Sequence, residues 1–136
     1  VSRWPFMDEV GEAWYAKPDA GQLIVSPCEE HATHPHDAWA DDMILAEGLA
    51  RYEQMVTAPV ARITANWAGL RSFAPDRALV IGRATQQPAF FWLVGQGGYG
   101  FQTCVAASQL TTDLIAGRPS ELTTQTRDAL SPDRFS

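Results

Sequence analysis

The sequence has few cysteines, little positive charge and no long apolar run. Cys28 and Cys104 are the two cysteines among 136 residues, which is too few for a disulfide framework and favours a reducing, cytoplasmic location. Lys and Arg number 10 against 16 acidic residues, so the net charge of -6 argues against nucleic-acid binding and against a membrane surface as partner. No apolar stretch approaches the roughly 20 residues that span a bilayer. We therefore expect no membrane span.

The composition that remains is that of a folded chain about one domain in length. Hydrophobic residues make up 46% and charged residues 19% of the sequence, which excludes wholesale disorder. Five Trp, six Phe and three Tyr carry a large aromatic area. Folding has to bury much of that area.

The first half of the sequence predicts a hairpin, a loop and a helix. Residues 14–16 and 22–26 have strand character, and the Pro, Asp and Gly between them favour a turn over residues 17–21. Residues 27–35 are polar and predict a loop. Apolar residues then recur at three- to four-residue spacing, which predicts a helix over residues 38–57 with Asp37 as its cap. Gly48 inside it costs about 1 kcal/mol relative to Ala.

Residues 60–73 predict an extended strand that places Arg71 on one face with Ile63, Trp67 and Phe73. If that face is covered, the Arg71 guanidinium needs an anion beside it. From the residues alone, two partners remain open. One is a structural ion pair with an acid such as Asp76, and the other is the carboxylate of a ligand.

The second half predicts a strand, a turn and a second helix. A short strand at residues 79–82 and a polar connection at 83–88 precede the apolar run 89–94, whose character suits a strand buried on both faces inside a sheet. A helix over residues 101–116 follows, with Gly117 and Pro119 as stop signals. The tail, residues 120–136, is polar. Because a central strand needs neighbours, we expect the isolated chain to self-associate or to pair with another segment.

Gly95, Gly97 and Gly100 match G-x-G-x-x-G between this strand and this helix. That is the context of a dinucleotide-binding fingerprint, but such a unit also needs a following parallel strand with an acidic residue. Glu121 has the right spacing, yet the residues after it lack the character of a buried strand. We therefore favour a tight contact of the glycines with a ligand or with another backbone. A sharp strand–helix corner is the remaining alternative.

Two further groups of residues are interpreted without a functional role. Acidic residues, His and one Cys crowd between residues 28 and 37, but their spacing matches no zinc pattern, so a solvated loop is favoured and no metal site is predicted. Cys104 lies in the first turn of the second helix, where a packed core cysteine is favoured over a nucleophile.

Several motifs together resemble the carboxyl-terminal part of the D-amino-acid oxidase family. They are Trp67-Ala68-Gly69-Leu70-Arg71, Pro75-Asp76, Ile81-Gly82, Phe91-Trp92-Leu93 and Gly95-Gln96-Gly97-Gly98-Tyr99-Gly100. The family comprises FAD-dependent amine and amino-acid oxidoreductases, among them glycine oxidase, sarcosine oxidase and D-amino-acid dehydrogenase. Gln96, Phe101 and Gln102 depart from its common pattern.

The resemblance implies roles for individual residues. Arg71 would hold the carboxylate of an amino-acid or amine substrate, with Gly98 and Tyr15 as further substrate-binding residues. The cofactor FAD would contact the turn formed by Gly97, Gly98, Tyr99, Gly100, Phe101 and Gln102. The resemblance points to no catalytic base, and we name no catalytic residue.

The expected fold is α+β and incomplete. Residues 1–74 would be part of a substrate-binding domain with antiparallel strands and one long helix. Residues 75–136 would add a strand, a glycine-rich turn and a helix to a flavin-binding domain. By this resemblance the chain is the carboxyl-terminal segment of an FAD-dependent oxidoreductase, inactive without an upstream ADP-binding part. The alternative is a non-catalytic interaction subunit or remnant with the same fold.

Overall fold

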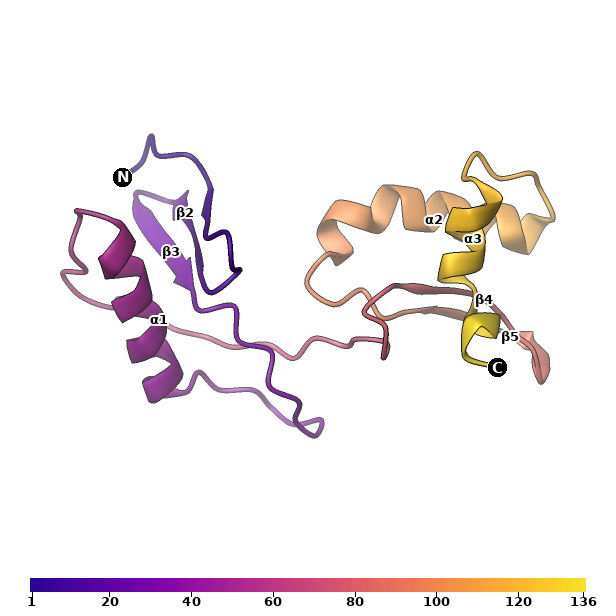
Figure 1. Ribbon diagram of the computed structural model, residues 1–136, viewed down its shortest axis with the longest axis horizontal. Helices are drawn as coiled ribbons and strands as arrows, with labels where there is room; N and C mark the ends of the chain where they lie inside the picture. Colours follow the sequence, from indigo (N-terminus) through magenta and orange to yellow (C-terminus); the bar gives the residue numbers. More distant parts are fainter. The chain divides into compact units, whose positions relative to one another are not determined.

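The computed structural model describes all residues from Val1 to Ser136, and they form two compact units, Val1–Leu70 and Arg71–Ser136. The elements are three α-helices, one short 3-10 helix and two small antiparallel sheets (Figure 1). This confirms the α+β class. No helix is long and apolar enough to cross a membrane.

The first unit opens with a three-stranded antiparallel sheet in the order β1-β2-β3. Its strands are β1 (Met7–Asp8), β2 (Tyr15–Asp19) and β3 (Gln22–Ser26). The predicted hairpin is therefore present, but its turn is shorter than residues 17–21, because Pro18 pairs with Leu23 inside the ladder. Ala20 and Gly21 form the two-residue turn with φ of 46° and 80°. Positive φ at both positions is typical of a type I′ hairpin turn.

Helix α1 (Asp42–Met55) lies beside this hairpin (Figure 1). It begins later than the predicted residue 38, because the Asp41 carboxylate, and not that of Asp37, accepts hydrogen bonds from the backbone N–H groups of Met43 and Ile44. Such bonds satisfy amides that have no partner within the helix. The loop between β3 and α1 has no regular structure, as predicted.

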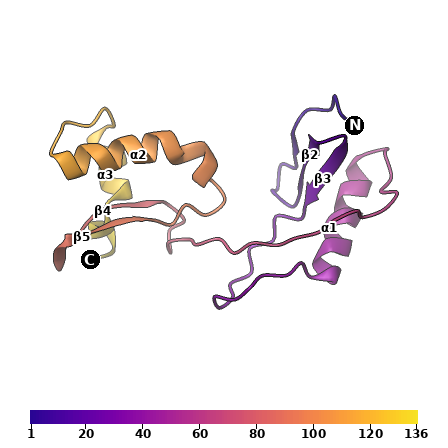
Figure 2. The ribbon, with the colours of Figure 1, turned by 180° about the vertical axis from the view of Figure 1, so that it is seen from behind.

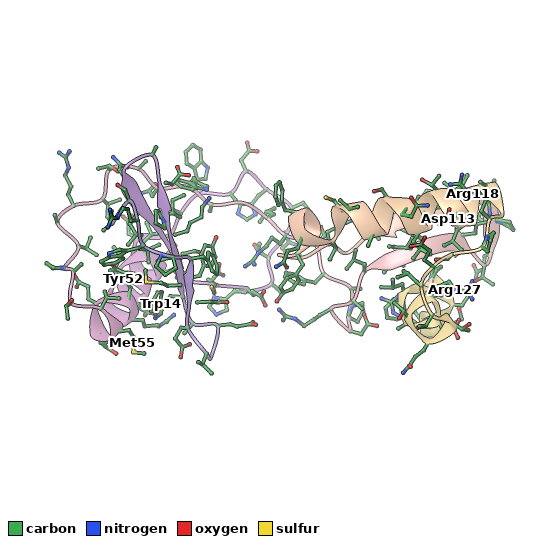
Figure 3. The ribbon with its side chains drawn as sticks, turned by 90° about the horizontal axis from the view of Figure 1, so that it is seen from above. Trp14, Tyr52, Met55, Asp113, Arg118 and Arg127 are labelled. Atoms are coloured by element: carbon green, nitrogen blue, oxygen red, sulfur yellow. The ribbon has the colours of Figure 1, made fainter.

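The core of the first unit lies between the hairpin and α1. Trp14, Ala16 and Tyr52 are buried there, and the rings of Trp14 and Tyr52 meet edge to face with centroids 5.4 Å apart (Figure 3). Gly48 has a specific reason to be glycine, since an ideal Cβ on it would lie 2.5 Å from Cβ of Pro27. The helix can approach the end of β3 because that position carries no side chain.

Residues 60–73 contain no strand, which corrects the prediction of one there. The segment lacks a sheet partner in either unit, and a strand exists only through hydrogen bonds to a neighbour. Nor is its presumed inner face covered, because the Trp67 side chain is 67% exposed.

The second unit is built on a two-stranded sheet of β4 (Val80–Ala84) and β5 (Gln87–Val94). The predicted connection over 83–88 shrinks to a tight turn, since Ala84 already pairs with Gln87. The placement of residues 89–94 inside a sheet is wrong for this structure. β5 pairs with β4 alone, and most of its residues are exposed.

Helix α2 (Gly100–Ala116) lies over the β4–β5 hairpin (Figure 2). Ala107 and Leu110 on its inner face pack against Ile81 of β4 and form the buried core of this unit. The helix ends at Gly117, whose φ of 66° is left-handed, so the predicted stop signal is confirmed. Near this end the buried Asp113 carboxylate accepts hydrogen bonds from Gln109 and Arg118 (Figure 3).

The tail forms α3 (Thr124–Leu130) and the 3-10 helix η1 (Pro132–Phe135), neither of which the sequence analysis predicted. Both begin at a capping side chain, because the hydroxyl of Thr123 accepts from Thr126 N–H and that of Ser131 from Asp133 N–H. No strand follows α2. A dinucleotide-binding βαβ unit is thus not completed within these residues.

Candidate functional site

The glycine-rich turn leads from β5 directly into α2. Gly95 and Gly97 have positive φ values of 77° and 52°, which glycine adopts at little cost. The N-cap residue of α2 is Tyr99, whose side chain makes no capping hydrogen bond. The first backbone amides of α2 therefore keep the partial positive charge of a helix N-terminus without a carboxylate or hydroxyl cap.

The segment that carries Arg71 runs against this turn. The backbone N–H of Gly97 donates to the carbonyl oxygen of Ser72 at 3.0 Å. An ideal Cβ on Gly97 would lie 2.5 Å from Cε1 of Phe73, and one on Gly98 would lie 2.9 Å from Nη1 of Arg71. The structure thus places Arg71 next to Gly98, within a single unit.

The predicted surroundings of Arg71 need a correction, because its side chain is exposed and not enclosed by an apolar face. Among its neighbours are Gly98, whose ideal Cβ would lie 2.9 Å from Nη1, and the ring of Phe73, whose centroid lies 5.7 Å from the guanidinium carbon. The guanidinium therefore lies at the surface of this unit, beside the amides of the glycine-rich turn.

The remaining predicted site residues have varied surroundings. Gly100 lies close to Gln96, whose Cβ would be 3.1 Å from an ideal Cβ on Gly100. Tyr99 and Gln102 are exposed, and the Phe101 side chain is 98% exposed. Tyr15 belongs to β2 of the first unit, where its ring stacks on that of Phe6 with centroids 5.6 Å apart.

These contacts bear on the two roles predicted for the glycines, which are a tight contact with a ligand or another backbone and a sharp strand–helix corner. Gly97 has a ring within its own unit that a side chain would displace, since an ideal Cβ would lie 2.5 Å from Phe73. Close packing is therefore one reason for glycine at position 97, whereas the arginine end beside Gly98 can move and Gln96 is only in tight contact with Gly100. The exposed side of the turn stays accessible at Gly98, where the guanidinium lies.

Asp76, which the sequence analysis considered as a partner of Arg71, is bound by another arginine. Nε of Arg134 donates to Oδ2 of Asp76 at 2.6 Å, and Nη2 donates to Oδ1 at 3.1 Å. This two-fold hydrogen bond from Arg134 lowers the pKa of Asp76 from 3.8 to about 2.

Two features of the sequence, the polar loop at residues 27–35 and Cys104, are predicted to have no functional role. Glu29 and His31 approach each other at 3.3 Å, but no three potential metal ligands gather in the structure. Cys104 is exposed, which corrects the prediction that it is packed in the core. Its thiol donates to the carbonyl oxygen of Phe101, one turn earlier in α2.

Sequence reasoning missed two residues that shape the site. Phe73 was assigned only to a strand face, whereas its ring packs against Gly97. Arg134 lies in the tail for which the sequence indicates only polar character, although it contacts Asp76, 58 positions earlier. The Ser131-Pro132 pair is a local signal for the helical turn that carries Arg134, but nothing in the sequence names its partner.

The α+β fold is consistent with a domain of an oxidoreductase family. The chain matches the FAD dependent oxidoreductase family over residues 1–114, and it belongs to that family. The resemblance seen in the sequence motifs is therefore confirmed.

Individual relatives are similar over part of the chain. A D-amino acid dehydrogenase of Neisseria meningitidis is 33% identical over 69 residues, which are 51% of this chain and 16% of that protein. One of Paramagnetospirillum magneticum is 35% identical over 69 residues, 51% of this chain and 15% of that protein. The tRNA 5-methylaminomethyl-2-thiouridine biosynthesis bifunctional protein MnmC of Maricaulis maris is 32% identical over 84 residues, 61% of this chain and 14% of that protein. The matched region is thus about a sixth of these relatives or less.

Proposed function

We propose that this chain is the carboxyl-terminal segment of an FAD-dependent oxidoreductase that oxidises an amino acid or amine. In the complete enzyme, residues 1–74 would belong to the substrate-binding domain and residues 75–136 would complete the flavin-binding domain. The observation that carries the proposal is the position of Arg71, whose Nη1 lies 2.9 Å from the position of an ideal Cβ on Gly98. A carboxylate anchor and a flavin contact would then be neighbours.

Arg71 would hold the substrate carboxylate. A guanidinium offers two parallel N–H donors that match the two oxygens of a carboxylate, so it fixes orientation as well as position. Gly98 would leave room for the substrate beside the guanidinium, and Tyr15 would be a further substrate contact. Orientation is the main contribution we assign to these residues, because holding the α-carbon in line for transfer lowers the barrier without any acid or base.

The glycine-rich turn and the start of α2 fit a flavin. The residues we assign to it are Gly97, Gly98, Tyr99, Gly100, Phe101 and Gln102. Missing Cβ atoms allow close backbone approach, and the helix N-terminus, which has no side-chain cap, favours negative charge beside it. Bound FAD would supply a two-electron acceptor for the hydride that leaves the substrate carbon. The backbone N–H groups of the turn would stabilise the charge that this transfer produces.

The partners we propose follow from the same assignment. Apolar side chains of β5 and α2, including Trp92, Phe101 and Val105, are exposed. Exposed apolar area of this extent marks a contact surface. We infer that the chain associates with an upstream flavin-domain segment or with another copy of itself. A concentration-independent monomer in sedimentation experiments would contradict this.

Kinetics of an Arg71→Ala variant of the complete enzyme test the proposal. A hydrogen bond to a charged group contributes about 1.5–3 kcal/mol, so the KM for an amino-acid substrate should rise at least about tenfold. An amine substrate without a carboxylate is the matched control and should keep its KM. Unchanged kinetics with both substrates would refute the role of Arg71.

Flavin binding separates this proposal from a non-catalytic interaction subunit. We expect flavin absorbance to co-purify when the chain is expressed together with an upstream ADP-binding segment. A stable complex of the two that retains no flavin would favour the interaction subunit.

A further inference from the structure

The 3-10 helix η1 is fastened to the turn that follows Arg71. Besides its two bonds to Asp76, Arg134 donates from Nη2 to the carbonyl oxygen of Ala78 at 3.0 Å and from Nη1 to that of Ser131 at 2.9 Å. Its side chain is only 13% exposed. Two donor nitrogens of the guanidinium, Nε and Nη2, thus join η1 to residues 76–78 through three hydrogen bonds.

A second contact fixes η1 on β4. An ideal Cβ on Gly82 would lie 2.7 Å from Cδ of Pro132, so the first residue of η1 packs directly on the backbone of the strand. Arg134 therefore extends to Asp76 from a segment that is itself held in place by its contact with β4.

The turn that Arg134 holds also contacts Phe73. The N–H of Arg77 donates to the carbonyl oxygen of Ala74 at 2.9 Å, and the N–H of Ala78 donates to Oδ1 of Asp76 at 3.1 Å. The guanidinium carbon of Arg77 lies 4.8 Å from the centroid of the Phe73 ring. That ring packs against Gly97, so the turn, the ring and the glycine-rich turn form one chain of contacts.

We propose that Arg134 is a positioning residue for the substrate anchor. By holding the turn of residues 74–78 against η1, it keeps Phe73 on Gly97 and Ser72 bonded to Gly97, and these two contacts set Arg71 beside Gly98. Residues 60–73 have no sheet partner, so the contacts of Ser72 and Phe73 with Gly97 are among the restraints on the anchor. This inference rests on the proposed function.

The test compares Arg134→Ala, Arg134→Lys and Arg118→Ala in the complete enzyme. Arg118 is the matched control, because it also binds an aspartate, Asp113, at 3.1 Å in the same unit, but at the other end of α2 from the glycine-rich turn. We expect Arg134→Ala to raise the KM for an amino-acid substrate about tenfold, the effect of one lost hydrogen bond to a charged group. The turnover of an amine without a carboxylate should stay unchanged.

Arg134→Lys should recover part of the effect, since an ammonium can replace one of the two bonds to Asp76 but not both. If Arg134→Ala fails to fold, the KM of Arg134→Lys tests the proposal in its place. Arg118→Ala should lower the unfolding temperature without changing either KM.

The outcomes separate this inference from the proposed function. A raised KM in Arg71→Ala together with an unchanged KM in both Arg134 variants would overturn the positioning role and leave the proposed function standing. A loss shared equally by both substrates in Arg134→Ala would overturn it as well, because it would show a general structural effect. An unchanged KM in Arg71→Ala itself would refute the proposed function.

Discussion

Replacing Gly97 with alanine tests the contact on which the candidate site depends. The new Cβ would lie 2.5 Å from Cε1 and 2.8 Å from Cδ1 of Phe73, so the ring would have to move. Overpacking of this kind costs about 1–3 kcal/mol. The left-handed backbone at Gly97, with φ of 52°, adds about 1 kcal/mol for any residue with a Cβ.

Gly117→Ala separates these two contributions. Gly117 has a φ of 66°, but nothing lies within 4 Å of an ideal Cβ on it. Its replacement should therefore show the backbone cost alone. The smaller conformational freedom of an unfolded chain with alanine offsets part of the loss in both variants and cancels in their difference. Gly97→Ala should thus lose about 1–3 kcal/mol more than Gly117→Ala.

Urea unfolding followed by the amide resonance of Leu110 measures this difference, because Leu110 is buried in the core of the second unit. The same pair of variants in a Phe73→Ala background provides the second arm of a double-mutant cycle. Without the ring, the difference between Gly97→Ala and Gly117→Ala should disappear. Equal losses in the original background would refute the packing of Phe73 on Gly97.

Three further predictions concern stability. Gly48→Ala should destabilise the first unit in thermal unfolding by about 1–3 kcal/mol, because the new Cβ would lie 2.5 Å from Cβ of Pro27. The higher helix propensity of alanine offsets only about 1 kcal/mol of this loss. A variant more stable than the original protein would contradict the contact between Gly48 and Pro27. Burial, and then the charge of Glu53, raise the pKa of Tyr52 above 10.0, so the stability it contributes is present below pH 10 and is lost as the pH rises further. Thermal unfolding followed by circular dichroism should show that Tyr52→Phe loses less stability above pH 10 than the unchanged protein does. An equal loss in both proteins would exclude Tyr52 as its cause. The pKa of Asp76 falls from 3.8 to about 2 through its bonds to Arg134, so its contribution is present above pH 3.8 and is lost toward pH 2; acid titration of Asp76→Asn should show a smaller loss there, and an equal loss would argue against the pair.

The sequence revealed those parts of the fold that local chemistry determines. Gly21 indicated the turn before β3 and Gly117 indicated the end of α2, because glycine adopts left-handed backbone angles at little cost. Helix α1 was found from its periodic apolar residues. The predicted start differs from the observed one by four residues, because both Asp37 and Asp41 can serve as caps and only the structure shows that Asp41 does so.

The errors arose where a residue's surroundings depend on distant parts of the chain. The alternation in residues 60–73 says which side chains would share a face, but it supplies no strand to pair with. In the same way, the apolar run in β5 shows what environment the strand suits, whereas the structure gives it a single neighbour, β4. Sequence spacing could not find the pair of Asp76 and Arg134, because it joins residues 58 positions apart.

The motifs around Arg71 and the glycine-rich turn led to the candidate site through their joint resemblance to one family. The structure then placed Arg71 beside Gly98 and added Phe73 as the side chain between this segment and the turn. The surroundings of Arg71 were beyond prediction, since exposure depends on every neighbour at once.

The membership of Arg71 in the second unit has a consequence for how such a protein can diversify. Arg71 and Gly98, whose ideal Cβ lies 2.9 Å from the guanidinium, both belong to the unit Arg71–Ser136. Under the proposed function, mutations in the first seventy residues could change which substrates bind, while Arg71 would still bind the carboxylate that these substrates share. New substrate specificities could then evolve in the first unit without loss of the carboxylate anchor in the second.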